Sequence, residues 1–193
     1  MLSVHFDLEA LLERTAALHR HLCPRQVLGV RIGILAGEML PLELPQNGKR
    51  LLAFVETDGC FADGVSVATG CSIGHRTMRV MDYGKVAATF VDSFTRRAWR
   101  IWPSPNARTR AVEFVPEAAN RWKAQLEAYQ RIPNEELLIS REVTLTVDLT
   151  AILGKPGTRT TCCLCGEEVL NQREVMKDGQ PMCKSCAGER YWR

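Results

Sequence analysis

The chain has 193 residues, of which 46% are hydrophobic, and this fits one globular domain with a small appended unit. Its net charge of +3 does not by itself indicate a nucleic-acid partner. The sequence has no apolar run of about 18 residues, which excludes a transmembrane helix. The N-terminal residues carry early acidic groups and no basic segment, so we expect no signal peptide and a cytoplasmic protein. The eight cysteines are then expected to be metal ligands or reactive groups rather than disulfides.

The first part of the chain predicts two helices followed by a buried strand. Asp7 is suited to cap a helix whose apolar face continues to His19, and Pro24 ends that helix. Pro24 is also a favoured first residue for a second helix over Arg25–Leu40. A strand is expected at Leu51–Glu56. Glycines recur every fourth residue of the second helix and allow another element to approach closely, at Gly29, Gly33 and Gly37.

The segment H-R-H-L-C-P, residues 19–24, lies where the first helix stops. Two imidazoles and a thiol at a chain reversal can converge on a metal ion, so His19, His21 and Cys23 are candidate ligands. In the alternative interpretation, His19 is a core histidine with its hydrogen bonds satisfied, His21 is exposed and Cys23 is packed.

The central stretch from Glu56 to Lys85 carries Cys60 and Cys71, each directly after a glycine. A short helix is predicted between them, at Ala62–Ala68, and its N-terminus would favour the Cys60 thiolate. The alternative is that both cysteines are small buried hydrophobic residues, as free cysteines often are.

The rest of the main domain mixes strands and helices without a regular βαβ rhythm. The expected strands are Arg79–Met81, Val86–Val91, Arg96–Trp102 and Val143–Leu149, with a hairpin turn at Asp82–Gly84 joining the first two. A helix is expected over Glu117–Arg131 and a short turn or helix over Glu135–Ile139. The pattern predicts an α+β fold with a mixed helix and antiparallel-sheet main domain.

The stretch Arg96–Arg110 contains five arginines, two tryptophans and no acid. Such a pattern can bind single-stranded nucleic acid or a phosphate. The alternative is an edge strand with its guanidinium groups in water and its indoles against the core.

The end of the chain contains Cys162-x-x-Cys165, seventeen residues, and then Cys183-x-x-Cys186. Two-residue spacers let both thiolates of a pair face one ion, and two pairs complete a tetrahedron, so we expect a structural zinc ion. Cys163 is expected not to be a ligand. The expected organisation is a main domain at 1–153, a linker at 154–160 and a zinc-ribbon or treble-clef-like module at 161–193.

The zinc module has six basic and five acidic residues between Arg159 and Arg193, a net charge of +1. This is a weak footprint for phosphate binding, so nucleic acid is not the expected partner. The module is expected to be a scaffold that docks on the main domain or on a second subunit, and a domain-swapped arrangement stays open.

Several motifs in this order resemble the FmdE family, named after formylmethanofuran dehydrogenase: H-R-H-L-C-P, L-G-V-R, G-C-F-A-D-G-V-S-V-A-T-G-C-S-I-G, D-Y-G-K-V-A-A-T-F and the closing four-cysteine module. The resemblance covers residues 15–95 and 160–190. It implies an α+β domain that forms a homodimer, with a zinc module beside it and a molybdenum or tungsten oxidoreductase as a partner.

The resemblance also implies a metal-binding pocket in the main domain. Its candidate ligands would be His19, His21, Cys23 and Cys60, with Cys71 in reserve, and Asp63 and Lys85 would line the same cleft. Arg20 and Arg25 stand where the family's usual pattern has glycine, which places two cations beside the site.

The resulting hypothesis is a metal-binding accessory subunit or metal-handling partner of a molybdenum or tungsten enzyme, with structural zinc and a second transition-metal ion. One alternative is a metal- or thiol-dependent enzyme in its own right, with Cys60 as nucleophile or redox thiol. A second is a nucleic-acid-binding regulator that uses the zinc module and Arg96–Arg110. No feature for holding molybdopterin or an iron–sulfur cluster is identified.

Overall fold

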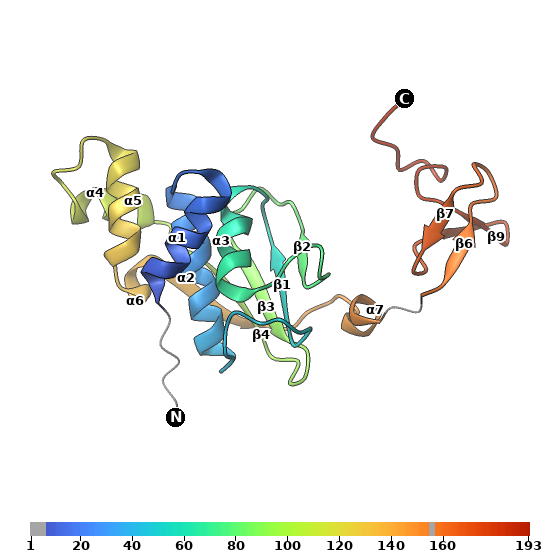
Figure 1. Ribbon diagram of the computed structural model, residues 1–193, viewed down its shortest axis with the longest axis horizontal. Coiled ribbons are helices and arrows are strands. Elements are labelled where there is room, and N and C mark those ends of the chain that lie inside the picture. Colours follow the sequence, from blue (N-terminus) through green and yellow to red (C-terminus); the bar gives the residue numbers. More distant parts are fainter. Residues whose placement is uncertain (1–6, 155–156) are drawn as a thin grey trace. The chain divides into compact units, whose positions relative to one another are not determined.

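The computed structural model describes residues 7–154 and 157–193, and the chain divides into two compact units (Figure 1). Unit 1 is Met1–Thr146 and unit 2 is Val147–Arg193. Unit 1 contains helices and a five-stranded sheet, while unit 2 has one short helix and two small hairpins in its described residues. The predicted α+β class is confirmed. No helix of the described residues is both long enough and apolar enough to cross a bilayer.

Two consecutive helices open unit 1, where the sequence predicts two helices separated by a break before Pro24. Helix α1 spans Leu8–His19, and the Asp7 carboxylate accepts a hydrogen bond from the Ala10 backbone N–H at 3.1 Å. The chain reverses through Arg20, which has a left-handed conformation, and α2 spans Pro24–Met39 with proline in its first turn.

Helix α3, Cys60–Thr69, packs closely against α2 because glycines line the crossing. A Cβ atom added to Gly29 would collide with the Phe61 carbonyl oxygen, and one added to Gly64 would collide with the Gln26 carbonyl oxygen. The predicted close approach at the glycine stripe of α2 is confirmed, and its partner is α3. This crossing brings the N-terminal ends of α2 and α3 together.

The sheet has the strand order β2-β1-β3-β4-β5. Its strands are β1 Leu51–Val55, β2 Met78–Val80, β3 Ala88–Asp92, β4 Ala98–Pro103 and β5 Leu138–Val143. The β1–β2 pair is parallel and the other three pairs are antiparallel. All residues of β1 and β3 are buried, so these two strands form the centre of the sheet.

The predicted hairpin between the strands near Val80 and Val86 is wrong, because β2 and β3 pair with opposite edges of β1. The connection instead passes the end of β1. The Glu56 carbonyl oxygen accepts hydrogen bonds from the backbone N–H groups of Tyr83 and Lys85, at 2.9 and 3.1 Å.

Strand β4 is not the edge strand that the arginine-rich stretch suggested, because it lies between β3 and β5. Two arginines of this stretch have carboxylate partners. Arg100, within β4, pairs with Glu56, and Arg97, just before β4, pairs with Glu142. The predicted strand at Val143–Leu149 is also wrong. Its position in the sheet is taken by β5, whose last pair joins Val143 to Ala98 at the beginning of β4, so later residues have no strand beside them.

The remaining helices of unit 1 are α4 Ala107–Phe114, α5 Arg121–Arg131 and α6 Asn134–Leu137. Helix α4 was not predicted. Helix α5 begins later than expected because Asn120, not Pro116, caps it, by accepting a hydrogen bond from the Lys123 N–H at 2.9 Å.

Unit 2 contains the short helix α7, Leu149–Leu153, which begins at the capping residue Asp148. Two antiparallel hairpins follow, formed by the strands β6 Arg159–Thr161 and β7 Glu168–Leu170, and by β8 Val175–Lys177 and β9 Gln180–Met182. The first cysteine pair lies in the β6–β7 turn, and the second follows β9.

Candidate functional site

The turn between α1 and α2 is fixed by one buried polar side chain, that of Gln26. Its Oε1 accepts a hydrogen bond from the Cys23 N–H at 2.8 Å, and its Nε2 donates to the Thr15 carbonyl oxygen at 3.2 Å. The amide therefore ties the start of α2 to the last turns of α1. It holds both ends of the segment that carries His19 and Cys23.

The other side of the site is the first turn of α3. Gly59 precedes this helix with φ 70° and ψ −150°, a conformation that residues with a Cβ atom avoid. Cys60 is the first residue of α3, and Asp63 lies three residues later, on the same face of the helix.

The structure brings these two segments together through two pairs of side chains. His19 Nε2 lies 2.5 Å from a carboxylate oxygen of Asp63. Cys23 and Cys60 line one cavity, and the Cys23 thiol raises the pKa of the Cys60 thiol. The end of α1, the start of α2 and the first turn of α3 thus place one imidazole, one carboxylate and two thiols in a single region.

The electrostatics of Cys60 differ from the sequence-based expectation. Partial burial raises the pKa of the Cys60 thiol, and the neighbouring Cys23 thiol raises it further. The backbone N–H of Cys60, at the start of the helix, lowers this pKa, but its effect is smaller than the sum of the other two. In the absence of a cation, Cys60 is therefore a neutral thiol rather than an activated thiolate.

The other residues predicted for this site lie at its edge or away from it. His21 is exposed, and its Nδ1 lies 2.8 Å from the His19 carbonyl oxygen. Cys71 follows the opposite end of α3, is 1% exposed, and contacts the Leu51 carbonyl oxygen with its sulfur at 3.5 Å. Lys85 is exposed and lines a cavity next to the site.

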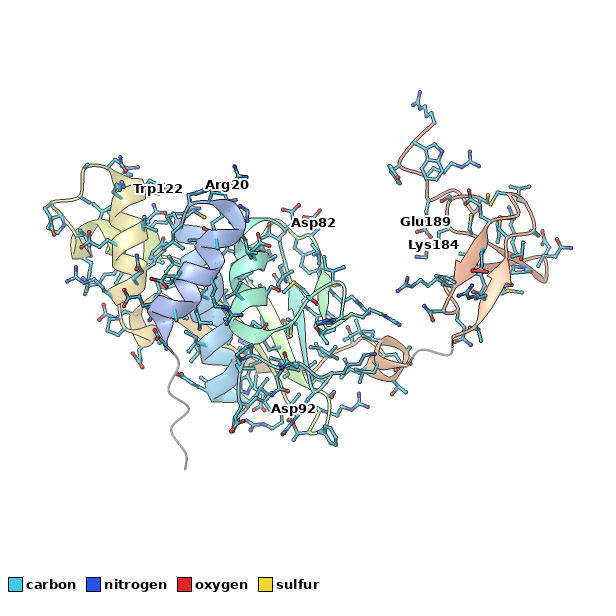
Figure 2. All side chains as sticks on the ribbon, in the orientation of Figure 1. Arg20, Asp82, Asp92, Trp122, Lys184 and Glu189 are labelled. Carbon is cyan, nitrogen blue, oxygen red and sulfur yellow. The ribbon has the colours of Figure 1, made fainter. Side chains whose placement is uncertain are left out.

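A cavity of about 380 Å³ opens beside the two thiols. Cys23 and Cys60 line it together with Arg108 from α4 and with Trp122 and Tyr129 from α5. Trp122 is 44% exposed, and Figure 2 marks it at the beginning of α5. The sequence pattern did not assign the last three of these residues to the site. The arginine-rich stretch contains Arg108, but periodicity gave no reason to place it beside the thiols.

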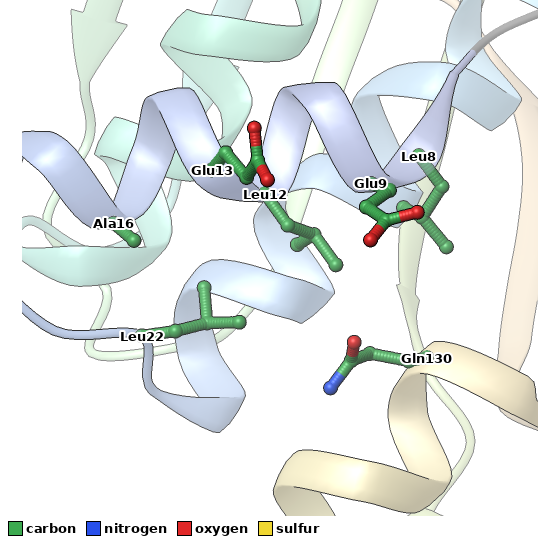
Figure 3. A pocket seen from close by; sticks show the side chains of 7 residues that line it. All are labelled: Leu8, Glu9, Leu12, Glu13, Ala16, Leu22 and Gln130. Atoms are coloured by element: carbon green, nitrogen blue, oxygen red, sulfur yellow. The ribbon is translucent and has the colours of Figure 1, made fainter.

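A separate cavity of about 450 Å³ lies between α1 and α5 (Figure 3). Glu9 and Glu13 contribute its carboxylates, and Gln130 faces them from α5. No cysteine or histidine lines it, so it is not an extension of the candidate site.

Unit 2 holds the second cluster. The sulfur atoms of Cys162, Cys165, Cys183 and Cys186 all lie within 4.8 Å of one another, and the Cys165–Cys183 distance is 3.9 Å. A tetrahedral zinc–thiolate site with bonds of about 2.3 Å has sulfur separations of about 3.8 Å, so the four residues fit such an ion. Cys163 is exposed and outside the cluster, as expected.

Backbone geometry prepares the four-cysteine cluster for a cation. The Cys162 sulfur accepts a hydrogen bond from the Cys183 N–H at 3.3 Å, and the Cys183 sulfur accepts one from the Cys186 N–H at 3.4 Å. Backbone N–H groups lower the pKa of Cys162 to about 6, while the neighbouring thiols, chiefly Cys183, raise the pKa of Cys186 to about 12. Four thiolates at this distance would repel one another, so deprotonation of all four depends on a bound cation.

Among residues 7–154 and 157–193, only this cluster brings three or more potential ligand atoms within 4.8 Å of one another. The residues of the unit 1 site do not converge to the same degree. His19 is instead hydrogen-bonded to Asp63, while the Cys23 and Cys60 thiols line one cavity.

Comparison with known proteins gives three findings. A family model described as "FmdE, Molybdenum formylmethanofuran dehydrogenase operon" matches residues 18–139. A probable S-adenosyl-L-methionine-binding protein of Archaeoglobus fulgidus is 31% identical over 206 residues, which cover 95% of this chain and 54% of the relative. The chain thus spans about half the length of that curated relative.

The third finding is the crystal structure of a tungsten formylmethanofuran dehydrogenase FmdE-like protein from Syntrophus aciditrophicus. It matches with a TM-score of 0.66 and 23% identity, and the match covers 97% of this chain and 96% of that one. At this identity the likeness shows a shared fold.

Proposed function

This chain belongs to the FmdE family, and from that premise we propose that it is a metal-binding accessory protein with two metal sites of different construction. The four cysteines of unit 2 hold a structural zinc ion. The His19–Asp63 and Cys23–Cys60 pairs of unit 1 hold a second transition-metal ion. The observation that carries the second site is the meeting of these two pairs at the first turn of α3.

Zinc is the ion proposed for unit 2 because four thiolates at tetrahedral spacing are its usual structural ligands. The described residues of the module expose most of their side chains, and they form only three-residue strands. Metal binding would therefore supply much of the free energy of folding for this unit.

In unit 1, the donor set of one imidazole, one carboxylate and two thiols suits a borderline transition metal such as Zn²⁺, Co²⁺ or Fe²⁺. The proton between His19 and Asp63 and the protons of the two thiols would leave when the ion binds. Such an ion polarises a bound ligand or lowers the pKa of a bound water. The His21 ring lies 5.9 Å from that of His19 and Lys85 lines the neighbouring cavity, so in this proposal both are outer residues, while Cys71 is in the core.

The accessory role is proposed from the family description, which names the operon of molybdenum formylmethanofuran dehydrogenase. In this proposal the chain handles metal for, or docks on, a molybdenum or tungsten oxidoreductase. A cytoplasmic location, where thiols stay reduced, is part of the same proposal.

Metal content tests the two-site proposal directly. The full chain, purified after growth with added zinc and cobalt, is expected to carry two metal ions per chain by elemental mass spectrometry. Cys60→Ser and His19→Ala variants should each carry one. A wild-type content of one ion that disappears with Cys183→Ser would contradict the second site.

Cys71→Ser is the matched control for Cys60→Ser, because it removes a thiol at the other end of the same helix. It is expected to keep two ions. Far-ultraviolet circular dichroism would verify that each variant is folded, so that a lost ion reports a lost ligand.

The partner and dimer proposals need separate measurements. Mixing the chain with purified molybdenum or tungsten formylmethanofuran dehydrogenase should give a complex in sedimentation velocity, and the chain alone should sediment as a homodimer. Separate sedimentation of chain and enzyme would contradict the accessory role and leave the metal sites untouched.

A second candidate function is binding of S-adenosyl-L-methionine, after the name of the archaeal relative. The observation that favours it is the aromatic wall of Trp122 and Tyr129 in the cavity beside Cys23 and Cys60, since aromatic side chains pack against adenine. Isothermal titration with S-adenosyl-L-methionine tests it, and absence of saturable heat would rule it out.

A further inference from the structure

The cavity beside the two thiols continues into a second cavity of about 440 Å³. The two cavities share four lining residues, which are Leu28, Val86, Arg108 and Tyr129. Arg108 also lines a third, open depression between α4 and α5. The first two cavities therefore form one groove, named here the Arg108 groove, which leads from Cys23 and Cys60 toward β4.

The charge of this groove is one-sided. Its lining contains Arg25, Lys85, Arg100 and Arg108, and none of its lining residues is acidic. Arg100 is neutralised by a two-pronged contact with Glu56, at 2.6 and 2.7 Å. The structure shows no ion pair between Arg25, Lys85 or Arg108 and any described carboxylate.

Each of these three cations comes from a different element. Arg25 is in the first turn of α2, Lys85 follows the crossing at the end of β1, and Arg108 is in the first turn of α4. The first turn of α4 also lines the groove, and helix N-termini favour anions. Three cations without a described carboxylate partner, each from a separate element, line the groove and raise its affinity for an anion.

The walls of the groove are aromatic as well as cationic. Tyr129 is 2% exposed, and Trp122 presents an accessible ring at the end near the thiols. Trp102 lines the other end, where its ring is already covered by Arg100 at 4.8 Å from the ring centroid. Lys123 Nζ lies 5.4 Å from the centroid of the Trp122 ring, but Trp122 is 44% exposed, so its ring is the more accessible surface against which a planar group can pack.

We propose that the Arg108 groove binds a small organic anion, in which a phosphate or carboxylate group contacts Arg25, Lys85 and Arg108 and a planar ring packs against Trp122. The ligand then lies beside Cys23 and Cys60. The groove does this with its own cations and does not require the second metal ion.

Four probes separate the contributions of charge and ring. Adenosine 5′-monophosphate and 2-naphthoate carry a planar ring with a phosphate or a carboxylate, while adenosine has only the ring and inorganic phosphate only the charge. Isothermal titration of the full zinc-loaded chain is expected to show saturable binding of at least one ring-bearing anion. That ligand should bind at least tenfold more tightly than adenosine and than inorganic phosphate. Absence of saturable binding by both ring-bearing anions would overturn the proposal.

The variant Arg108→Gln is expected to weaken binding of the ring-bearing anion at least tenfold, because it removes the cation common to both cavities. Arg14→Gln is the matched control. It removes one exposed arginine of α1 that lines neither cavity, and it should change the affinity less than twofold. Equal losses in the two variants would show only a response to net charge and would overturn the assignment.

His19→Ala distinguishes this proposal from the metal proposal, because His19 lines neither cavity of the groove. The variant should lose the second metal ion but bind the anion within about threefold of wild type. If anion binding disappears with His19→Ala and persists in Arg108→Gln, the anion is a metal ligand and the assignment to the groove is wrong.

Discussion

The two cysteine sites of this chain are built in opposite ways. In unit 2, four sulfurs that come from two short turns of a 25-residue stretch meet within 4.8 Å. In unit 1, Cys23 and Cys60 belong to different helices, and their contact depends on the crossing of α2 and α3. A metal site made by local turns is visible as a spacing in the sequence, whereas one made by packing is visible only after folding.

The difference also concerns what stabilises each site. The unit 1 site rests on a buried core, and its His19–Asp63 pair is joined by a hydrogen bond without a metal. The unit 2 cluster crowds four thiols among small hairpins. We therefore expect unit 1 to fold without metal and unit 2 to need it.

The largest expected effect is the loss of the unit 2 fold in Cys183→Ser. Binding of structural zinc contributes about 10–16 kcal/mol in small zinc modules, so its loss should unfold the hairpins. The measurement is amide hydrogen exchange by mass spectrometry, resolved by peptide. Exchange should become fast over 159–182 and stay unchanged over β1 and β3.

Cys163→Ser is the matched control, since Cys163 is an exposed thiol beside a ligand. It should leave exchange in both units unchanged. Slow exchange of the hairpins in Cys183→Ser would mean that unit 2 folds without its metal, and the contrast between the units would fail.

The next effect is expected from Gly64→Ala, which attacks the crossing on which the unit 1 site depends. The added methyl group meets the Gln26 backbone, so the two helices must separate, at a cost of about 3 kcal/mol. Urea unfolding of the zinc-loaded chain measures this cost. The second metal ion should also bind more weakly, while the four-cysteine cluster keeps its ion.

Gly74→Ala is its control, because a Cβ atom at Gly74 meets no atom within 4 Å. Its free energy of unfolding should stay within about 0.5 kcal/mol of wild type, as for ordinary surface substitutions. Equal stabilities of Gly64→Ala and Gly74→Ala would show that the close crossing is not required.

A smaller effect is expected from Asp63→Asn. The amide keeps the size of the side chain but removes the charge that faces His19. The second metal ion should bind at least about tenfold more weakly, because a neutral amide is a poorer donor to a transition metal than a carboxylate. Competition with a chromophoric chelator measures this, and an unchanged affinity would exclude Asp63 from the site.

The smallest effect concerns the response of unit 1 to acid. Burial works to raise the pKa of Asp92, but hydrogen bonds from Arg50 and from the Phe94 N–H outweigh it and hold the pKa below its usual value. A lowered pKa in the folded state means that the stabilisation is present above the unfolded pKa of about 3.9 and is lost as the pH falls through the folded value.

Asp92→Asn should therefore destabilise unit 1 by about 1 kcal/mol at pH 7 and by less at pH 3. Urea unfolding at the two pH values measures the difference. A loss of stability that is equal at both would show that the charge of Asp92 does not contribute.

Much of the fold followed from local signals. The Asp7 cap, the stop before Pro24 and the glycine stripe of α2 each have a short-range physical cause, and each is found in the structure. The unit 2 cluster followed from spacing alone. These features depend on backbone conformations that a few neighbouring residues determine.

The errors have a common cause, which is strand pairing over long distances. The alternation of apolar and polar residues after Val143 is typical of a strand. The pairing of β4 with β5 ends at Ala98 and Val143, however, so the later residues have no strand beside them. The turn near Tyr83 looks like a hairpin, but β1 occupies the place between β2 and β3. A pattern within a segment does not say which segment lies beside it.

The site in unit 1 was foreseen in part. The histidine–cysteine segment and Cys60 were candidates, and the structure brings His19, Cys23, Cys60 and Asp63 into one region. The groove residues Arg108 and Trp122 were not foreseen as neighbours of the thiols, because α4 and α5 reach them only through the packing of the folded unit.

The most direct test of the two-site proposal is anomalous X-ray diffraction from crystals of the cobalt-loaded chain at the cobalt absorption edge. We expect two peaks per chain, one among the four cysteines of unit 2 and one between Cys23, Cys60 and the His19–Asp63 pair. A single peak at the four cysteines, from crystals grown in excess cobalt, would contradict the claim that unit 1 holds a metal.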